Sequence, residues 1–310
     1  MLNNWLNRLA KLRVDRASNN PAPHKPLLLL AILDQIEEGC ITSNVVRLTP
    51  ELAFRFLGYW EVVSSRGRSV GRAELPFFHL QSDGLLKHVA IPGLEAALGS
   101  IRPTSVELIN KVISHAELPE EFFRLMQNAD HRSAARKILV AGSWFFPEEK
   151  IKLLAMLGLS SSDFDLDGES MPTASRDEDV KQVRDIKFRL QIVPLYHYSC
   201  ALCDIKILLP SGITLVEAAH IHQFAQSKND DITNGMALCR NHHWAFDQGL
   251  WSIDTNFVVV ARDKFAEQAP NQTGLMTYQS KQLDFSWLRP EHRPSQKNLD
   301  WHRQHKFIGQ

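Results

Sequence analysis

The sequence predicts an α+β protein with two domains, for three reasons. The first half of the 310-residue chain contains several helix-like segments and one stretch that looks like two short strands joined at Asp83-Gly84. A Ser- and Asp-rich segment without helical periodicity follows. Three of the four cysteines come after that segment. We therefore expect a mainly helical first domain with a small antiparallel sheet, and a second domain that binds metal.

The overall composition is that of an ordinary globular protein, with 44% hydrophobic and 23% charged residues. The formal net charge is zero, so the total charge does not point to a nucleic-acid partner. No apolar run reaches the ~18 residues of a membrane span, and the N-terminus lacks the features of a signal peptide. We expect a cytoplasmic protein without membrane contact.

The helices of the first domain follow from apolar periodicity and from end signals. The amphipathic start of the chain, "MLNNWLNRLAKLRV", predicts a first helix. A central helix is expected around the apolar residues 27–33, with Pro26 in its first turn and Gly39 at its end. Thr49 and Pro50 predict the start of another helix. Further helices are expected near residues 104–115, 119–127, 131–141 and 147–157.

The strands and the domain limits come from turn and composition signals. The stretch "LPFFHLQSDGLLKHV" predicts a strand, a turn at Asp83-Gly84 and a second strand. The Ser- and Asp-rich segment predicts a linker. We place the first domain at residues 1–158, the linker at 159–180 and the second domain at 181–310. The second domain is expected to contain an initial helix, a β-hairpin turning at residues 210–212, and a loop that enters a helix in "NGMALCRNHHWAFDQG".

Two pairs of metal-binding side chains stand in the second domain. Cys200 and Cys203 are separated by two residues, and so are Cys239 and His242. This spacing lets both members of a pair reach one ion from a tight turn, so the four residues predict a closed tetrahedral zinc site. Four protein ligands leave no open position, which favours a structural role for this zinc.

A second metal site is predicted beside the first. His243 and Asp247 are four residues apart on the expected helix and therefore lie on one face. An imidazole and a carboxylate at this spacing can hold a divalent cation that keeps open positions. His220 and His222 lie upstream, and they would share a face if their segment were a strand.

Residues 196–254 resemble an HNH nuclease domain of the zinc-stapled, McrA-like kind, whose fold is a ββα-metal finger. The motif of that family has a His at the end of the first strand, an Asn in the loop and a His on the helix, which match His220, Asn234 and His243. The resemblance implies that His220 is the general base that activates water and that Asn234 holds the His220 turn. It also implies that His243 and Asp247 bind Mg²⁺ or Mn²⁺, which polarises the phosphate and stabilises the leaving 3′ oxygen.

The sequence departs from the family at one position. Many members have Asp or His just before the general base as a further metal ligand, whereas this chain has Ala219. The ion can then have fewer protein ligands, or Glu217 or His222 can take that place. Otherwise Glu217 is a solvated strand charge, and His222 supports a metal ligand or contacts a phosphate. We expect Trp244 and Phe246 to pack under the metal finger.

Two segments of the first domain, "HKPLLLLAILDQIEEG" and "SSRGRSVGRAELPFFHLQSDGLL", resemble the sulfur-binding domain of phosphorothioate-dependent restriction endonucleases. The resemblance implies recognition of DNA in which sulfur replaces one non-bridging phosphate oxygen. Sulfur is larger, softer and less hydrated than oxygen, so a small apolar pocket rimmed by cations can prefer it. The residues expected to contact DNA are His24, Lys25, Arg66, Arg68, Arg72, Phe78 and His79.

These residue types suit contact with DNA, although each has a structural alternative. His24 and Lys25 lie at a helix N-terminus, which favours a phosphate, and the arginines lie on a glycine-containing loop that can follow a groove. The loop can instead be an ordinary solvated loop. One of Phe77 and Phe78 is expected in the core because strand neighbours alternate faces, and His79 can serve in packing.

The sequence therefore predicts a modification-dependent restriction endonuclease that binds phosphorothioated double-stranded DNA and hydrolyses a phosphodiester bond nearby. Because one HNH site cuts one strand, double-strand cleavage implies a homodimer or two binding events, and we expect a homodimer. One alternative is an HNH nuclease that reads methylated or unmodified DNA, for which an aromatic cage would be evidence. A second alternative is a zinc-stapled DNA-binding regulator without catalysis, which would need only the four zinc ligands.

Overall fold

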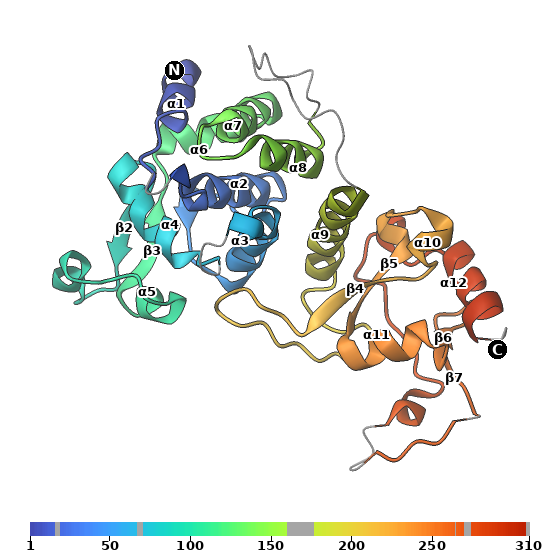
Figure 1. The fold of residues 1–310 in the computed structure, drawn as a ribbon. Coiled ribbons are helices and arrows are strands. Elements are labelled where there is room, and N and C mark those ends of the chain that lie inside the picture. The colour runs from blue at the N-terminus through green and yellow to red at the C-terminus, as the bar shows by residue number, and fades with distance from the viewer. Residues whose placement is uncertain (16–18, 67–70, 160–176, 264, 270–273, 308–310) are drawn as a thin grey trace. The chain divides into compact units, whose positions relative to one another are not determined.

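The computed structural model describes residues 1–15, 19–66, 71–159, 177–263, 265–269 and 274–307. The chain forms two compact units: unit 1 contains Met1–Ile186 and Leu209–Ile213, and unit 2 contains Lys187–Leu208 and Thr214–Gln310 (Figure 1). Most of the predicted linker, residues 160–176, lies outside the described part of the chain. Within the described part, no helix combines the length and the apolar character needed to cross a bilayer.

Unit 1 is mainly helical, as predicted, and is built around α2 (His24–Glu37) (Figure 1). Residues 26–33 of this helix are all buried, because α3, α4 and α7 pack around it. A helix that is apolar on every side is stable in water only when it is covered on every side. The helices of this unit, besides α2, are α1 (Leu2–Leu9), α3 (Pro50–Val62), α4 (Glu74–His79), α5 (Val106–Val112), α6 (Glu120–Met126), α7 (Ala129–Ala141) and α8 (Pro147–Leu157).

The end signals read from the sequence operate as expected in unit 1. The side chain of Thr49 accepts a hydrogen bond from the backbone N–H of Leu52 at 3.2 Å, and Pro50 is the first residue of α3. Gly39 follows α2 with a φ of 73°, a conformation that favours glycine. The termini of α2 and α3 are therefore encoded locally.

A small antiparallel sheet completes unit 1, in the order β1 (Val45–Val46), β3 (Ile113–Glu117), β2 (Lys87–Ala90). The predicted first strand near residues 75–80 is wrong, because this segment forms α4 followed by a 3₁₀ turn at Leu80–Asp83. Pro76 fits the first turn of a helix but cannot donate to a sheet ladder. The helix also places Phe77 and Leu80 together in the core.

The strand β3 was not predicted, because residues 104–115 read as one helix. The structure ends α5 at Val112, and Ile113 adopts an extended conformation. Two consecutive β-branched residues at this point favour the change from helix to strand. β3 is the central strand of the sheet and pairs with both β1 and β2.

Unit 2 contains the ββα arrangement that the HNH resemblance implies. The strands β4 (Val216–His220) and β5 (Gly235–Cys239) are antiparallel, and α11 (Arg240–Asp247) follows β5 directly. The prediction of a loop at residues 234–239 is wrong for β5. All five residues of β5 are buried, so the strand lacks the alternation of polar and apolar residues that sequence patterns detect. The turn at residues 210–212 exists, with a 2.8 Å hydrogen bond from Leu209 N–H to Ile213 O, but the main partner of β4 is β5.

The core of unit 2 joins the ββα motif to the flanking helices. Phe188 and Ile192 of α9 (Asp177–Leu195) pack with buried residues of β4, β5 and α11, including Phe246. Leu299 of α12 (Gln296–His302) closes the same core. Among the described residues, unit 2 also contains α10 (Phe224–Ser227), β6 (Trp251–Ile253), β7 (Val259–Ala261) and several short helical turns.

Candidate functional site

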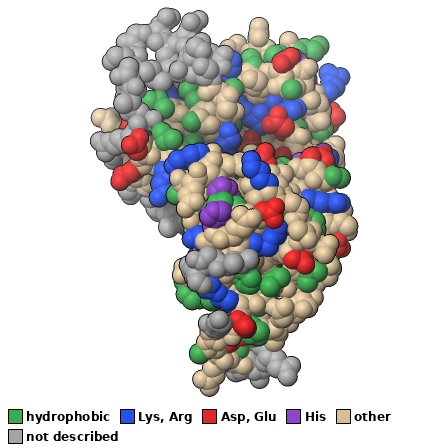
Figure 2. All heavy atoms as spheres, turned by 90° about the vertical axis from the view of Figure 1, so that its right-hand side faces the viewer, with side chains coloured by type: hydrophobic (Ala, Val, Ile, Leu, Met, Phe, Trp, Pro, Cys, Tyr) green, Lys and Arg blue, Asp and Glu red, His purple; other side chains and the backbone are tan. Residues whose placement is uncertain are grey.

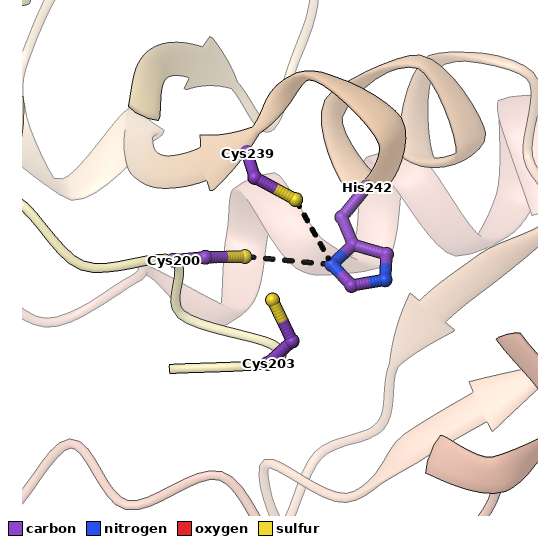
Figure 3. A group of neighbouring side chains, drawn as sticks. All are labelled: Cys200, Cys203, Cys239 and His242. Atoms are coloured by element: carbon purple, nitrogen blue, oxygen red, sulfur yellow. Dashed lines mark hydrogen bonds between the residues drawn. The ribbon is translucent and has the colours of Figure 1, made fainter. Parts of the chain in front are cut away.

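Three cysteines and one histidine of unit 2 converge, as Figure 3 shows. Cys200 and Cys203 lie in the turn that follows α9, Cys239 ends β5, and His242 lies in the first turn of α11. The turn is tightly organised, because the backbone N–H of Cys200 donates to Ile205 O at 3.0 Å and that of Asp204 donates to Cys200 O at 2.9 Å.

The spacing of these four ligand atoms fits a tetrahedral ion. All four lie within 4.8 Å of one another, and the Nδ1 atom of His242 is 3.5 Å from Cys200 Sγ and 3.3 Å from Cys239 Sγ. A tetrahedral zinc with its usual bond lengths separates a sulfur and a nitrogen ligand by about 3.6 Å. Within the described part of the chain, this is the one group of three or more His, Cys, Asp or Glu residues that is close enough to share a metal ion.

Some of these ligands hold protons that a metal would displace. Burial lowers the pKa of His242, but hydrogen bonds to Cys200 and Cys239 outweigh burial and raise that pKa to about 9. Hydrogen bonds to Cys200 and Cys203 lower the pKa of Cys239. A ligating imidazole must be neutral and a ligating thiol must be ionised, so metal uptake at neutral pH releases protons.

His220 stands at the end of β4 with its imidazole ring fixed on two sides. The ring stacks on Phe188 of α9 with a centroid distance of 3.9 Å and an interplanar angle of 5°. Its Nε2 atom is 2.8 Å from Oδ1 of Asp230. The sequence pattern identified His220 but not its carboxylate partner, because Asp230 and Asp231 are equivalent in sequence.

Asn234 lies in the loop between β4 and β5 and is completely buried. Its Oδ1 atom accepts a hydrogen bond from the backbone N–H of His222 at 2.8 Å. Its Nδ2 atom donates to the carbonyl oxygens of His222 and Asn229, both at 2.9 Å. The three bonds connect both ends of the loop, so the side chain fixes the backbone just after His220.

His243 projects from α11 between two carboxylates. Its Nδ1 atom is 3.1 Å from Oε2 of Glu217 on β4, and its Nε2 atom is 3.6 Å from Oδ2 of Asp247. Glu217 also accepts a hydrogen bond from Arg240 at 3.0 Å. Two ligands at ~2.1 Å from one ion can be at most about 4.2 Å apart, so His243 Nε2 and Asp247 Oδ2 fit a shared divalent cation.

The pKa of Asp247 on α11 depends on burial and on nearby charges. Partial burial raises the pKa of Asp247, and the positive charges near it, including Lys306, act in the opposite direction.

Phe246 is fully buried, as expected, but Trp244 is 61% exposed. The expectation that Trp244 packs under the finger is therefore wrong, because α11 turns this side chain away from the core.

A cavity of about 380 Å³ lies in unit 1, between the start of α2 and α4. Apolar side chains such as Leu75 and Pro76 form part of its wall, together with Lys25. The Nζ atom of Lys25 contacts Asp83 Oδ2 at 2.6 Å, which holds the ammonium group in place. The full set of lining residues is Arg13, Val14, Asp15, Ala22, His24, Lys25, Leu75, Pro76 and His79.

The comparisons with known proteins bear on both units. Residues 2–162, slightly more than half of the 310-residue chain, match the family described as ScoMcrA-like, DNA sulfur-binding domain. The chain belongs to the ScoMcrA-like DNA sulfur-binding domain family. In addition, residues 200–254 match the HNH endonuclease family. The chain therefore joins a DNA sulfur-binding domain to an HNH endonuclease domain.

The chain also resembles part of a solved structure. A structure described as a modification dependent TagI restriction endonuclease is similar with 23% sequence identity and a TM-score of 0.31. The alignment covers 40% of this chain and 38% of that one, so the chain spans little more than a third of that protein. No curated protein matches.

Three of the residues predicted to contact DNA lie together in the sulfur-binding domain. They line its cavity and are His24, Lys25 and His79. Burial lowers the pKa of His79, and the positive charge of Lys25 lowers it further. Arg13 and Leu75, which were not predicted, line the same cavity. No local motif marks them, because the fold rather than the sequence spacing brings them to the cavity.

The DNA contact predicted for Arg66 stays a prediction, and the structure places the side chain inside the fold. Its side chain is 2% exposed and forms an ion pair with Glu149 of α8. The guanidinium group also donates to Pro21 O at 2.6 Å and to Trp144 O at 2.8 Å. With these acceptors inside the fold, Arg66 is a structural residue of the sulfur-binding domain.

The other predicted contacts have mixed positions. The side chain of Arg72 is 38% exposed and donates to Glu74 and to the carbonyl oxygens of residues 103 and 104. Phe77 is the core residue of the Phe pair. Phe78 stacks on His88 with a centroid distance of 5.4 Å and does not belong to the cavity lining. Arg68 lies outside the described residues.

Proposed function

We propose that this protein is a modification-dependent restriction endonuclease that binds phosphorothioated double-stranded DNA and cuts a phosphodiester bond nearby. The observation that carries the proposal is the arrangement of His220, Asn234 and His243. They stand at a strand end, in the following loop and on the helix of a ββα unit, in a chain that also has a DNA sulfur-binding domain. A regulator without catalysis would need the four metal ligands but none of these three residues.

The cavity of the sulfur-binding domain is the proposed site for the modified phosphate. A phosphorothioate keeps its negative charge, which Lys25 and the N-terminus of α2 attract. The wall near the sulfur would be formed by Leu75 and Pro76. An apolar wall costs little when it desolvates sulfur and more when it desolvates oxygen, which gives the preference. His24 and His79 would contribute polar contacts at the same cavity.

Zinc is the proposed ion of the Cys₃His cluster. Thiolate and imidazole ligands in a closed set of four favour zinc with a structural function. The cluster connects the turn after α9 to the junction of β5 and α11, so it would fix the start of the helix that carries His243. His242 and His243 thus serve two different centres.

A second divalent cation, Mg²⁺ or Mn²⁺, is proposed at His243 and Asp247. It would supply positive charge to the scissile phosphate and the leaving oxygen. We propose that Glu217 supports this site indirectly, because its carboxylate contacts Nδ1 of His243 and leaves Nε2 for the ion. His222 is placed differently, since its ring stacks on Trp301 with a centroid distance of 4.0 Å.

The proposed reaction uses His220 as the general base. The imidazole takes a proton from a water molecule, whose oxygen attacks the phosphorus atom. The bond between phosphorus and the 3′ oxygen breaks, and the leaving oxygen is protonated by solvent to give a 3′ hydroxyl and a 5′ phosphate. Because one such site cuts one strand, we propose that a homodimer makes the double-strand break. Such an enzyme would act on DNA in the cytoplasm.

The surface near this site has features that suit DNA. Figure 2 shows histidine side chains beside Lys and Arg side chains on one face of the molecule. Trp301 of α12 stacks against both His222 and His305. Burial lowers the pKa of His222, and the nearby His305 and Lys297 lower it further. The positive charge beside His222 that can attract phosphates without base specificity is that of Lys297, because the lowered pKa keeps His222 itself neutral.

The test of the nuclease assignment separates cleavage from binding. His220→Ala should reduce cleavage of a phosphorothioated duplex by at least ~100-fold, because the general base is lost. Binding of the same duplex, measured by gel shift without divalent metal, should stay within about twofold, since the sulfur-binding domain is unchanged. His115→Ala, on β3 and outside both sites, is the matched control. Unchanged cleavage by His220→Ala would contradict the assignment.

A further inference from the structure

The contact between His220 and Asp230 is not part of the nuclease motif. We propose that Asp230 is a positioning residue that holds the His220 imidazole in one orientation and one tautomer for base catalysis. The proposal rests on the proposed nuclease function and adds a residue to it. The carboxylate acts through His220 and does not itself touch DNA.

The hydrogen bond determines which ring nitrogen can act as the base. Asp230 Oδ1 lies 2.8 Å from His220 Nε2, a distance typical of a strong hydrogen bond between imidazole and carboxylate. A carboxylate only accepts hydrogen bonds, so the proton of the neutral ring must reside on Nε2. The lone pair is then on Nδ1, which becomes the atom that receives the proton of the attacking water.

The ring cannot easily turn over to exchange its two nitrogens. One face of the imidazole stacks on Phe188 almost in parallel, at 3.9 Å and 5°. Phe224 lies close to the same ring, with a centroid distance of 5.8 Å. Two aromatic contacts and one hydrogen bond leave His220 a single orientation. Such an arrangement avoids reorganisation when the base acts.

The position of Asp230 is itself fixed by the buried Asn234. Asn229 is the residue just before Asp230, and its carbonyl oxygen accepts a hydrogen bond from the Asn234 side chain at 2.9 Å. On the other side, Asp231 N–H donates to the Asn229 side chain at 2.9 Å. These bonds set the backbone on both sides of Asp230. Asn234 therefore acts on His220 in two ways, through the strand end and through the loop that carries Asp230.

The neighbouring Asp231 has a separate task, which makes it a matched control. Its carboxylate accepts hydrogen bonds from the backbone N–H and the hydroxyl of Thr233, at 2.8 Å and 2.6 Å. It caps the 3₁₀ turn Ile232–Asn234. Asparagine is also a good cap, so Asp231→Asn removes the same charge as Asp230→Asn while it preserves the turn.

The first measurement needs no cleavage. In the full-length, zinc-loaded protein labelled with ¹⁵N-histidine, we expect His220 to be protonated on Nε2 at neutral to alkaline pH. In Asp230→Asn the amide can donate as well as accept, so the tautomer shifts toward Nδ1–H or becomes mixed. Asp231→Asn should keep the tautomer of the natural protein. An unchanged tautomer in Asp230→Asn would overturn the proposal.

The second measurement is the kinetics of cleavage. Asp230→Asn should lower kcat by ~10- to 1,000-fold, with KM and the metal concentration for half-maximal rate unchanged. In a His220→Ala background, Asp230→Asn should cause no further loss, because its effect passes through His220. A shift in the metal requirement would show instead that Asp230 is a metal ligand. An equal further loss in the double variant would show that it acts independently of His220, and either result overturns the proposal.

The two measurements separate the proposal from the function on which it rests. If the natural protein cuts no DNA but the tautomer result holds, the nuclease function fails and the contact remains a structural fact. If the natural protein cuts and Asp230→Asn cuts at the same rate, the positioning role fails and the nuclease stands.

Discussion

Arg66 has a role inside the fold that explains why this loop residue does not need DNA to be ordered. Its guanidinium group forms an ion pair with Glu149, and both side chains are almost completely buried. Glu149 also accepts a hydrogen bond from the backbone N–H of Phe146 at 2.8 Å, at the start of α8. Removing one partner of such a pair leaves a buried charge without compensation, which costs more than the pair contributes.

The first prediction concerns this ion pair. Arg66→Ala should lower the free energy of unfolding of the sulfur-binding domain by roughly 3–5 kcal/mol, because Glu149 keeps an unpaired buried charge. Urea unfolding measures this loss. Arg72→Ala is the control. Because the Arg72 side chain is 38% exposed, its removal should lower the free energy of unfolding by less. A loss of DNA affinity without a loss of stability in Arg66→Ala would support the DNA contact predicted from the sequence.

For single residues, the sequence predicts a role when the residues that share it are close in sequence. It does not predict contacts between residues that are far apart in sequence. The two C-x-x-C and C-x-x-H pairs give a zinc-type cluster whose ligand atoms do converge. By contrast, Glu149 is 83 positions from Arg66. Nothing in the sequence around Arg66 distinguishes an arginine that faces a groove from one that is neutralised by a distant helix.

Among the elements, α11 depends on contacts at both of its ends. Its start is held by the Cys₃His cluster, and its end packs on the buried His302 of α12. The His302 ring stacks on Phe246 with a centroid distance of 3.6 Å. Its Nε2–H donates to the carbonyl oxygen of Phe246 at 3.0 Å, so in the neutral ring Nδ1 accepts from the Ser252 hydroxyl at 2.9 Å. These two attachments set the position of the helix that carries His243 and Asp247.

The second prediction concerns removal of the metal from the cluster. Structural zinc contributes ~10–16 kcal/mol in zinc-finger peptides, so a strong chelator should unfold much of the HNH domain. Circular dichroism should show this loss, and metal analysis of the natural protein should give about one zinc ion per chain. Cys239→Ser should behave like the chelated protein, and Cys40→Ser, which changes an exposed cysteine outside the cluster, should not. An unchanged spectrum after complete zinc removal would contradict a structural role.

The third prediction concerns acid stability. Burial lowers the pKa of His302 to about 4. The hydrogen bond to Phe246 acts in the opposite direction, and the positive charges of Lys306 and Arg303 lower the pKa further. In the unfolded chain a histidine titrates near ~6.5, so between these two values the unfolded state binds more protons. The stability present above pH ~6.5 is therefore lost as the pH falls toward ~4, by up to about 3 kcal/mol.

His302→Gln tests this assignment because it removes the titrating group but keeps a polar side chain. Its unfolding free energy, measured in urea from pH 7 to pH 4, should fall less steeply than that of the natural protein. An identical slope in both proteins would mean that another group is responsible.

The elements themselves were predictable to the extent that their signals are local. Helix ends such as Thr49-Pro50 were correct, because capping acts within one turn. The segment Glu74–His79 was misread as a strand, since short apolar runs fit either structure, although Pro76 favours a helix start and packing against α2 stabilises it. β5 was misread as a loop for the related reason that its burial on every side removes the alternation.

For the whole molecule, the chain joins a sulfur-binding domain to an HNH domain, and we propose that the first selects the DNA and the second hydrolyses it. An HNH domain reads mainly phosphates and has little sequence choice, so selection must come from elsewhere. The sequence predicted this pairing from two resemblances. It predicted His24, Lys25 and His79 but not Arg13 or Leu75. The residues that line the cavity of the sulfur-binding domain come from separate segments that only the fold brings together.

The central claim is tested most directly by cleavage of two DNA duplexes that are identical except for one pair of phosphorothioates. Several core sequences should be tried in each form, with Mg²⁺ or Mn²⁺ present and at physiological salt. We predict that the full-length protein cuts the sulfur-bearing duplex at least ~10 times faster than its unmodified twin. Equal cutting of both duplexes would contradict sulfur-dependent selection, and cutting of neither, with binding intact, would contradict the nuclease.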